Sequence, residues 1–369
     1  MKKISLVFGT RPEAIKLCPV IHALKKDGSM PIHVCVTGQH RQMIDQVLQV
    51  FGVKPDVDLA LMQPNQTLAG LTSRAIEKLD QYFTEQKPDV VLVQGDTTTV
   101  MAAALTAFYH KIKVGHVEAG LRTYNKFAPF PEEINRRVVG PIADYHFAPT
   151  EAAAQALRNE KIDPASIYVT GNTVIDALFR VRDEVRQKAP ELPAGLAEAI
   201  HGKRMILVTG HRRESFGEQF ENICRAIRTI VETHKDVVVV YPVHLNPKVQ
   251  EPVRRLLSGL DRIHLVEPQS YLPFVWLMDH ATLVLTDSGG VQEEAPSLGK
   301  PVLVMRETTE RPEGIAAGNA KLVGTDFEKI VGETAHLLTS PAAYRAMADA
   351  SNPYGDGKSS ARIVEILKR

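Results

Sequence analysis

The feature that most constrains the fold of this chain is the regular alternation of short apolar runs with longer amphipathic stretches. The runs are continuously apolar and rich in β-branched residues, so they predict strands that are covered on both faces, as in parallel sheets. Repeated strand–helix alternation of this kind predicts an α/β protein built from doubly wound, Rossmann-like units. The predicted strands lie at residues 4–8, 32–36, 90–93, 113–117, 145–147, 205–208, 237–241, 263–266, 283–285 and 301–304, and helices are predicted at 41–51, 66–85, 218–234, 271–280 and 359–368.

The chain is long enough for two such units, and the series of apolar runs breaks once near its middle. Its 369 residues exceed the size at which a single hydrophobic core stops growing. A charged, helical stretch follows residue 172, and Pro190, Pro193 and Gly195 punctuate it before the second series begins. The expected organisation is a first domain at residues 1–172, a second at 173–352, and a terminal segment at 353–369 with a turn and a last helix.

Composition and charge exclude several classes of function. Lys and Arg total 44 against 43 for Asp and Glu, so no uniform field attracts nucleic acid or an anionic membrane. The three cysteines lie far apart without CxxC or a Cys/His cluster, which disfavours disulfides and a zinc site. No stretch approaches the roughly 18 apolar residues of a membrane span, and the first run is too short for a signal peptide. We expect a cytoplasmic protein that binds neither nucleic acid nor membrane.

The first strand leads into the sequence GTRPEAIK, which combines a helix start with a cation. Pro12 is expected as the first helical residue, with Thr10 or Arg11 as the cap. A cation at a helix start opposes the helix dipole, and a bound anion there would reverse the sign of that effect. Arg11 is therefore either an anion ligand or a surface residue paired with Glu13.

Acidic residues follow two strands and open one helix in the first half. Asp96 lies in QGDTTT, Glu118 in HVEAGLRT and Glu132 in PFPEEINR. Taken singly, Asp96 is explained as a helix cap, Glu118 as the partner of Arg122, and Glu132 by the helix dipole. Ligands of parallel sheets bind beyond the carboxyl ends of the strands, where these residues converge. Carboxylates held close together raise one another's pKa, which proton-transfer chemistry needs.

The second half carries two anion-binding signals at strand ends. In TGHRRESFGE, His211 and two arginines follow a glycine, and the alternative is a histidine packed among polar loop residues. In DSGGVQEEAP, Ser288 and the two glycines after it open a helix, so bare backbone N–H groups form a phosphate cradle, with Glu294 placed to bind a ribose. There is no GxGxxG and no Walker lysine, which disfavours a dinucleotide or ATP. We expect a nucleoside diphosphate here, facing the acids of the first half across a cleft.

The segments GTRPEAIK, QGDTTT, HVEAGLRT, PFPEEINR, TGHRRESFGE, DSGGVQEEAPSLGKPV and ERPEG, in this order, resemble those of the bacterial non-hydrolysing UDP-N-acetylglucosamine 2-epimerases. The resemblance implies the GT-B fold, in which two Rossmann-like domains face a central cleft and the last helix returns to the first domain. It also implies reversible conversion of UDP-N-acetylglucosamine (UDP-GlcNAc) to UDP-N-acetylmannosamine (UDP-ManNAc) for surface polysaccharides. A homodimer is implied as well, and neither a metal nor a redox cofactor is needed.

The implied chemistry explains why acids and cations occur together. The C2 hydrogen of the sugar is too weakly acidic for direct removal, but cleavage of the C1–O bond to UDP acidifies it. Elimination gives 2-acetamidoglucal and UDP, and re-addition with protonation on the other face gives the epimer. The resemblance assigns catalysis to Asp96, Glu118, Glu132 and His211, without saying which carboxylate is acid and which is base. It assigns substrate binding to Arg11, Lys16, Gln269, Phe274, Ser288, Gly289, Gly290, Glu294 and Arg311.

Some members of this family bind a second UDP-GlcNAc as an activator beside the active site. The residues that match this site are Gln39, His40, Gln42 and His244. The arginine expected before Gln66 is Asn65 here, and this departure leaves dependence on the activator open.

Other functions share the nucleotide cradle and stay open as alternatives. A GT-B glycosyltransferase of the retaining kind often has two glutamates eight positions apart, whereas Pro301 and Val302 lie eight positions after Glu293 and Glu294. A hydrolysing 2-epimerase would release free N-acetylmannosamine. A regulator that only binds a nucleotide sugar would have no use for the carboxylates of the first half.

Overall fold

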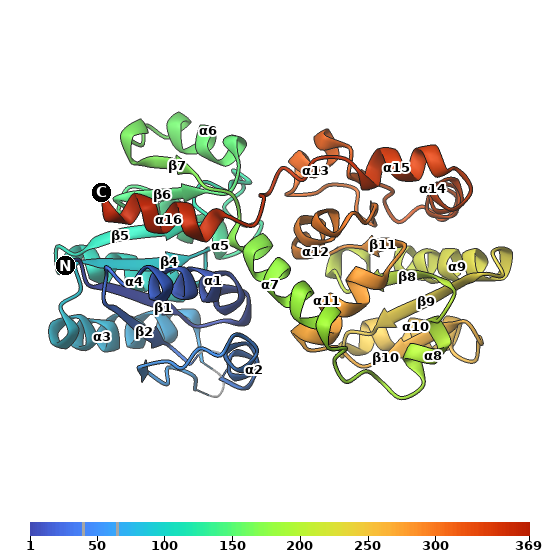
Figure 1. Ribbon diagram of the computed structural model, residues 1–369, viewed down its shortest axis with the longest axis horizontal. Helices are drawn as coiled ribbons and strands as arrows, with labels where there is room; N and C mark the ends of the chain where they lie inside the picture. Colours follow the sequence, from blue (N-terminus) through green and yellow to red (C-terminus); the bar gives the residue numbers. More distant parts are fainter. Residues whose placement is uncertain (39–40, 64–65) are drawn as a thin grey trace. The chain divides into compact units, whose positions relative to one another are not determined.

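The computed structural model describes residues 1–38, 41–63 and 66–369, which form two compact units (Figure 1). The first unit contains Met1–Ala177 together with Tyr354–Arg369, and the second contains Leu178–Pro353. The chain therefore passes between the units twice, once within helix α7 (Thr173–Gln187) and once at Pro353. Each unit is built around a parallel β-sheet with helices, which confirms the expected α/β class.

The sheet of the first unit has, among the described residues, seven strands in the order β3-β2-β1-β4-β5-β6-β7, all paired in parallel. The order reverses between β1 and β4, and such a switch point is where open parallel sheets bind ligands. The strands are β1 (Ile4–Phe8), β2 (Ile32–Val36), β3 (Val57–Asp58), β4 (Val90–Gln94), β5 (Lys113–Val117), β6 (Tyr145–Ala148) and β7 (Ile167–Val169). The helices are α1 (Arg11–Asp27), α2 (Arg41–Phe51), α3 (Leu68–Gln86), α4 (Thr98–Tyr109), α5 (Glu132–Val139), α6 (Glu151–Asn159), the 3-10 helix η1 (Pro164–Ser166) and α16 (Ser359–Lys368).

The second unit, all of whose residues are described, repeats this plan with six parallel strands in the order β10-β9-β8-β11-β12-β13. Its switch point lies between β8 and β11. The strands are β8 (Arg204–Thr209), β9 (Val237–Pro242), β10 (Ile263–Val266), β11 (Leu283–Thr286), β12 (Val302–Val304) and β13 (Ala320–Leu322). The helices are α8 (Leu196–Ile200), η2 (Arg213–Ser215), α9 (Glu218–Thr233), α10 (Pro247–Leu257), α11 (Tyr271–His280), α12 (Gly289–Glu294), η3 (Ala295–Leu298), α13 (Pro312–Ala317), α14 (Phe327–Thr339) and α15 (Pro341–Ala348).

Small side chains bring helix α4 close to the sheet of the first unit. Ala103, Ala104 and Ala107 are fully buried in one cluster with Val91 and Val93 of β4. Each large apolar side chain in such a cluster contributes about 1.5–3 kcal/mol through burial. The loop between β4 and α4 is therefore carried on a rigid base at the switch point.

The last helix belongs to the first unit. Helix α16 packs against α1 (Figure 1), and the carboxylate of Asp176 accepts hydrogen bonds from the backbone N–H groups of Ser359, at 3.2 Å, and of the next residue, at 2.8 Å. Gly171 has a φ of +88°, and a Cβ there would lie 2.6 Å from Ser359 Oγ, so only glycine fits. The expected return of the last helix to the first domain is confirmed.

The sequence pattern was wrong or silent in two local respects. Strands β3 and β13 lie at sheet edges and have two and three residues, which is too short to give a periodic signal. Helix α1 begins at Arg11, so Pro12 is its second residue and Thr10 is the N-cap. Among the described residues, no helix combines the length and the apolar character needed to cross a bilayer.

Candidate active site

The acidic residues predicted from the sequence lie at the carboxyl edge of the first unit's sheet. Asp96 follows β4, Glu118 follows β5, and Glu132 is the first residue of α5. Arg11 and Lys16 lie in the first two turns of α1, which starts at the same edge after β1. The elements beside the switch point therefore carry both the carboxylates and the cations that the sequence predicts.

Glu13 caps helix α1 and ties it to the next loop. Its carboxylate accepts hydrogen bonds from the backbone N–H groups of Gly9, at 2.8 Å, and Thr10, at 2.6 Å, and from Thr97 Oγ1, at 2.5 Å. Burial raises the pKa of Glu13, against the effect of these hydrogen bonds. These donors hold the carboxylate of Glu13 at the start of α1.

Glu118 is the centre of a buried polar cluster. Its Oε2 atom forms an ion pair with Lys16 Nζ and accepts hydrogen bonds from Gln94 Nε2, at 3.1 Å, and Asn172 Nδ2, at 3.3 Å. Glu118 itself has a φ of +67°, a conformation that is strained for a residue with a side chain. A carboxylate held by a cation and two amides at a strand end is oriented by its partners and is 9 % exposed.

Arg122 is not the partner of Glu118, which corrects one alternative considered from the sequence. Its guanidinium forms a bidentate pair with Glu160, both contacts being 2.8 Å. The loop turns at Gly120 directly against α6. A Cβ at Gly120 would lie only 2.2 Å from the carbonyl oxygen of Ala153 in that helix. Arg122 is thereby directed to Glu160 at the end of α6.

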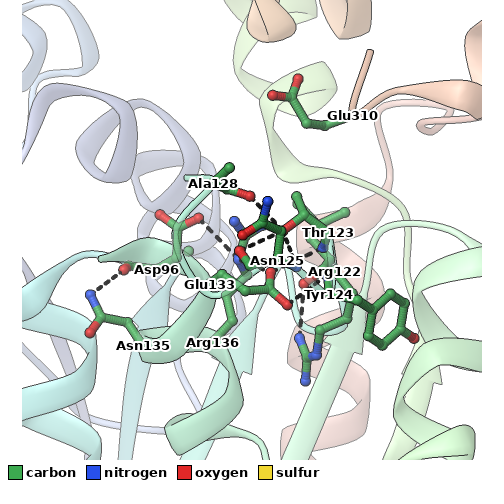
Figure 2. Close-up of polar contacts among 12 residues, drawn as sticks. Asp96, Arg122, Thr123, Tyr124, Asn125, Ala128, Glu133, Asn135, Arg136 and Glu310 are labelled. Atoms are coloured by element: carbon green, nitrogen blue, oxygen red, sulfur yellow. Dashed lines mark hydrogen bonds and ion pairs between the residues drawn. The ribbon is translucent and has the colours of Figure 1, made fainter. Parts of the chain in front are cut away.

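Asp96 is not a helix cap. Thr97 is the N-cap of α4, and its hydroxyl accepts a hydrogen bond from the backbone N–H of Val100 at 3.4 Å. Asp96 is instead held from helix α5, since Asn135 Nδ2 donates to its backbone carbonyl at 2.8 Å and Arg136 Nε lies 3.6 Å from its Oδ2 atom (Figure 2). The capping alternative is therefore wrong, and the Asp96 carboxylate lies beside the guanidinium of Arg136 instead.

The two glutamates that open helix α5 have different environments. Glu133 is fully buried, and its carboxylate accepts the backbone N–H groups of Thr123, at 3.0 Å, and Tyr124, at 3.1 Å (Figure 2). Glu133 therefore fixes the loop that leads from β5 into α5. Glu132 Oε2 is a buried oxygen with no hydrogen-bond partner among the described residues. Of the pair, Glu132 is the one whose contacts within the protein leave it unsatisfied.

Two neighbouring strands of the first unit carry buried histidines. His116 of β5 and His146 of β6 are register partners, and each places Nε2 near a glycine carbonyl, of Gly95 at 2.7 Å and of Gly140 at 2.8 Å. Burial lowers the pKa of His146 and lowers the pKa of His116 from 6.5 to about 3. Both rings are therefore neutral at neutral pH, with the proton on Nε2 where the carbonyl accepts it.

We predict that the protein loses stability in mild acid because of His116. A folded-state pKa below the unfolded one means that protons bind the unfolded chain first, so this stability is present above pH 6.5 and is lost as pH falls towards 3. The contribution of His116 alone is about 2 kcal/mol between pH 8 and pH 5. Urea unfolding at both pH values measures it. His116→Gln, which cannot titrate, should lose about 2 kcal/mol less than the parent, and an equal loss contradicts the prediction.

In the second unit, Asp287 organises the switch point between β8 and β11. Its Oδ2 atom accepts the backbone N–H groups of His211, at 2.6 Å, and Arg212, at 2.7 Å, and its backbone carbonyl accepts Arg212 Nε at 3.3 Å. His211 Nδ1 lies 3.3 Å from Asp287 Oδ1, although the two are not aligned as a hydrogen bond. Asp287 is 3 % exposed, so the loop after β8 is fixed by a buried carboxylate.

The ring of His211 stacks on that of His244, with centroids 5.2 Å apart and planes 13° apart. Burial lowers the pKa of His211; Asp287 acts in the opposite direction, and His244 and Arg212 act in the same direction as burial. A neutral imidazole with one nitrogen towards a carboxylate keeps the other available for a ligand.

The Ser-Gly-Gly sequence lies at the start of α12. Ser288 is the N-cap, and neither Gly289 nor Gly290 has a positive φ. A Cβ at Gly289 would come no closer than 3.8 Å to the Arg311 guanidinium, and one at Gly290 no closer than 3.9 Å to a Glu294 oxygen. These are ordinary van der Waals distances, so the fold itself does not require glycine here. Absence of side chains instead leaves backbone N–H groups open to a close ligand.

The residues around this helix start are oriented by hydrogen bonds. Arg311 Nε donates to Glu293 Oε1 at 2.5 Å, and Tyr271 donates its hydroxyl proton to Glu294 Oε1 at 2.9 Å. Gln292, which directly precedes the two glutamates, accepts a hydrogen bond from Thr309 Oγ1 at 2.6 Å. The loop after β12, which carries Arg311, is therefore attached to α12.

A second attachment joins the loop after β12 to the loop after β8. The buried Arg306 guanidinium donates to Glu214 Oε1 and to Glu310 Oε2, both at 2.6 Å. Burial alone would raise the pKa of Glu310, but Arg306 outweighs it and lowers the pKa to about 2. Arg306 is thus a structural cation in this unit.

Comparisons with known proteins identify the family to which this geometry belongs. The family model described as UDP-N-acetylglucosamine 2-epimerase matches residues 22–368. The chain belongs to this epimerase family. The UDP-N-acetylglucosamine 2-epimerase of Escherichia coli K12 is 57 % identical over 99 % of this chain and 98 % of its own length. The enzyme of the same name from Bacillus subtilis 168 is 55 % identical, over 99 % and 94 %.

Solved structures of epimerases agree with the sequence relatives. The UDP-GlcNAc 2-epimerase of Neisseria meningitidis bound to UDP-GlcNAc has a TM-score of 0.89 and 48 % identity, and the match covers 100 % of both chains. The enzyme of Methanocaldococcus jannaschii in complex with UDP-GlcNAc and UDP has a TM-score of 0.81 and 36 % identity, covering 99 % of both. The family and the GT-B fold class predicted from the sequence motifs are thereby confirmed.

The remaining residues predicted for this epimerase-family chain are placed as follows. Gln269 donates through Nε2 to the Glu267 carbonyl at 2.6 Å and lines a groove of about 800 Å³ at the start of α11. Phe274 lies half-buried on the same helix. In the predicted activator group, His244 follows β9 and Gln42 lies on α2. Gln39, His40 and Asn65 lie outside the described residues.

Three residues of this epimerase that orient predicted site residues were not predicted from the sequence: Asp287, Gln94 and Asn172. Asp287 sits in the quoted DSGG motif at the end of β11, next to β8 in the sheet, so its position was a usable signal. Gln94 and Asn172 gave none, because their contacts with Glu118 bridge 24 and 54 residues.

Proposed function

We propose that this chain is a non-hydrolysing isomerase that interconverts UDP-GlcNAc and UDP-ManNAc by elimination of UDP and re-addition to 2-acetamidoglucal. The observation that carries the proposal is the family match, which is 57 % identity over 99 % of the chain to an enzyme of this name. The oriented carboxylates at the carboxyl edge of the first unit's sheet support it, because a nucleotide-sugar binder without proton transfer would not need them.

In this proposal the first unit moves the protons. Glu118, oriented by Lys16 and two amides, and Asp96, held from α5, are two of the acid–base groups. Glu132, with a carboxylate oxygen that no described residue satisfies, is the third. Arg11 and Lys16 add positive charge that favours the departing diphosphate. Cleavage of C1–O generates oxocarbenium character, which makes the C2 proton removable, and protonation from the opposite face inverts C2.

The second unit holds the uridine diphosphate. The backbone at Ser288, Gly289 and Gly290 binds the diphosphate, with His211 and Arg311 beside it. Support comes from two glycines that the fold does not require and from the carboxylate of Asp287, which fixes the His211 loop. The other contacts proposed are Glu294 with the ribose, and Gln269 and Phe274 with uracil.

The experiment that tests this function is proton NMR of UDP-GlcNAc incubated with the protein in D2O. We expect UDP-ManNAc to appear with deuterium at C2, because the proton removed from one face is replaced from solvent on the other. Free N-acetylmannosamine accumulating instead would assign the chain to the hydrolysing class. If the C2 hydrogen does not exchange, and the sugar is transferred once a sugar acceptor is added, the glycosyltransferase is favoured instead.

We infer further that the protein is a cytoplasmic homodimer that supplies a surface-polysaccharide pathway and that Gln39, His40, Gln42 and His244 take a second UDP-GlcNAc. What supports the activator site is the match of these residues to the family pattern, and Asn65 weighs against it. Starting the reaction from UDP-ManNAc tests it. A lag that added UDP-GlcNAc abolishes supports activation, and linear progress from time zero contradicts it.

A further inference from the structure

Two side chains that the proposed mechanism leaves unused hold consecutive peptide carbonyls of one loop. His116 Nε2 lies 2.7 Å from the carbonyl oxygen of Gly95, and Asn135 Nδ2 lies 2.8 Å from that of Asp96 (Asn135 and Asp96 in Figure 2). Both side chains are buried, at 1 % and 3 % exposure. They reach the loop from different elements, β5 and α5.

The loop that they hold turns at a glycine. Gly95 has a φ of +82°, and a Cβ there would have no heavy atom within 4 Å, so neighbouring side chains do not restrict it. Its own N–H bonds to the carbonyl of Val117 at 3.0 Å, which fixes the peptide on one side. The two carbonyl contacts then act on the peptide from which the Asp96 side chain extends, in addition to Arg136, which lies 3.6 Å from its carboxylate.

His116 makes this contact at an energetic cost. A carbonyl oxygen only accepts, so the ring carries its proton on Nε2, and Nδ1 is then a buried nitrogen without a partner among the described residues. Burial lowers the pKa of His116 to about 3, so the ring is neutral at neutral pH and its one proton is the one on Nε2. A buried acceptor without a partner destabilises a fold. A purely apolar residue in this place would avoid that penalty but would release the Gly95 carbonyl.

We propose that His116 and Asn135 are positioning residues for the Asp96 carboxylate, which they aim by fixing the carbonyls of Gly95 and Asp96. The inference rests on the proposed function, in which Asp96 transfers protons. Displacing a catalytic group by about 1 Å can lower turnover by about 100-fold, so a pair of donors that selects one loop conformation matters to rate.

The chain supplies a matched control. His146 is the register partner of His116 on β6, is equally buried, and makes the same Nε2 contact with a glycine carbonyl, of Gly140 at 2.8 Å. Its carbonyl lies after α5 and not in the Asp96 loop. A general requirement for buried histidine hydrogen bonds would affect both histidines alike.

The test is a double-mutant cycle on kcat, with the D2O assay as readout. His116→Leu and Asn135→Leu are each made in the parent and in Asp96→Asn. We expect each to lower kcat by about 10- to 100-fold in the parent, with KM within about threefold, and to change kcat by less than about threefold in Asp96→Asn. His116→Gln, whose Nε2 can still donate, should restore most of the rate. His146→Leu should leave kcat within about threefold of the parent.

Each other outcome overturns the inference. Equal losses in the parent and in Asp96→Asn mean that the two residues act on the fold and not through Asp96. A kcat loss for His146→Leu as large as for His116→Leu has the same meaning. If His116→Leu does not fold, Asn135→Leu tests the claim through the other carbonyl. Full activity of Asp96→Asn removes Asp96 from catalysis, and lack of C2 exchange by the parent removes the proposed function, so these failures are distinguishable.

Discussion

Replacing Glu118 by glutamine is expected to lower turnover by about 10²- to 10⁴-fold while UDP still binds. The carboxylate follows β5, which is next to β4 in the sheet, and is oriented by Lys16, Gln94 and Asn172, so in the proposed mechanism the substitution removes an acid–base group that is already oriented. Asp96→Asn is expected to act in the same range. The D2O assay measures kcat, and calorimetric titration with UDP measures binding and the active fraction.

The matched control for this prediction is Glu160→Gln. Glu160 also pairs with a buried cation, Arg122, but it lies at the end of α6. The Glu160→Gln protein should be less stable to unfolding, and its kcat should stay within about threefold of the parent value. A Glu118→Gln protein that binds UDP and turns over at the parent rate would remove Glu118 from the mechanism.

Asp287→Ala is expected to weaken UDP binding and to lower kcat/KM by about 100-fold or more. The carboxylate accepts two backbone N–H groups of the His211 loop, and its removal leaves both donors without this partner in a half-buried turn. The same loss should destabilise the second unit by about 2–4 kcal/mol. Titration with UDP and urea unfolding measure the two effects.

Asp326→Ala is the appropriate comparison, because Asp326 also accepts a backbone N–H, of Lys329 at 2.8 Å, but at the start of α14. The Asp326→Ala protein should lose about 1 kcal/mol of folding stability, because the substitution removes an N-cap, and should keep its affinity for UDP. If Asp287→Ala loses stability but binds UDP as the parent does, Asp287 has no role in holding the nucleotide loop.

Strand ends could be read from the sequence because parallel strands buried on both faces are continuously apolar. That signal placed Asp96 and Glu118 after β4 and β5, and His211 and Ser288 at the other switch point. The two short edge strands gave no such signal. The family motifs then identified the chain, which the periodic pattern alone could not do.

The partners of these residues could not be predicted, since they depend on tertiary contacts. Lys16 and Glu118 are 102 positions apart, and the nearer Arg122 turns instead to Glu160 because Gly120 presses the loop against α6. Glu132 and Glu133 are adjacent and identical in type, yet only Glu133 accepts the backbone N–H groups of the preceding loop, whereas a buried oxygen of Glu132 has no partner among the described residues. The partner of each charged side chain is determined by tertiary packing, and residue spacing in the sequence does not show it.

Helix α16 belongs to the first unit although it is the last element of the chain, and this affects how the protein folds during synthesis. Its buried residues Ile363, Val364 and Leu367 leave the ribosome only after the entire second unit has been translated. Until then α1 lacks the helix that covers it, and Asp176 lacks the serine N–H groups that it binds. The first unit therefore has an uncovered apolar face on the ribosome while the second unit is being made. During that interval chaperones can bind this face.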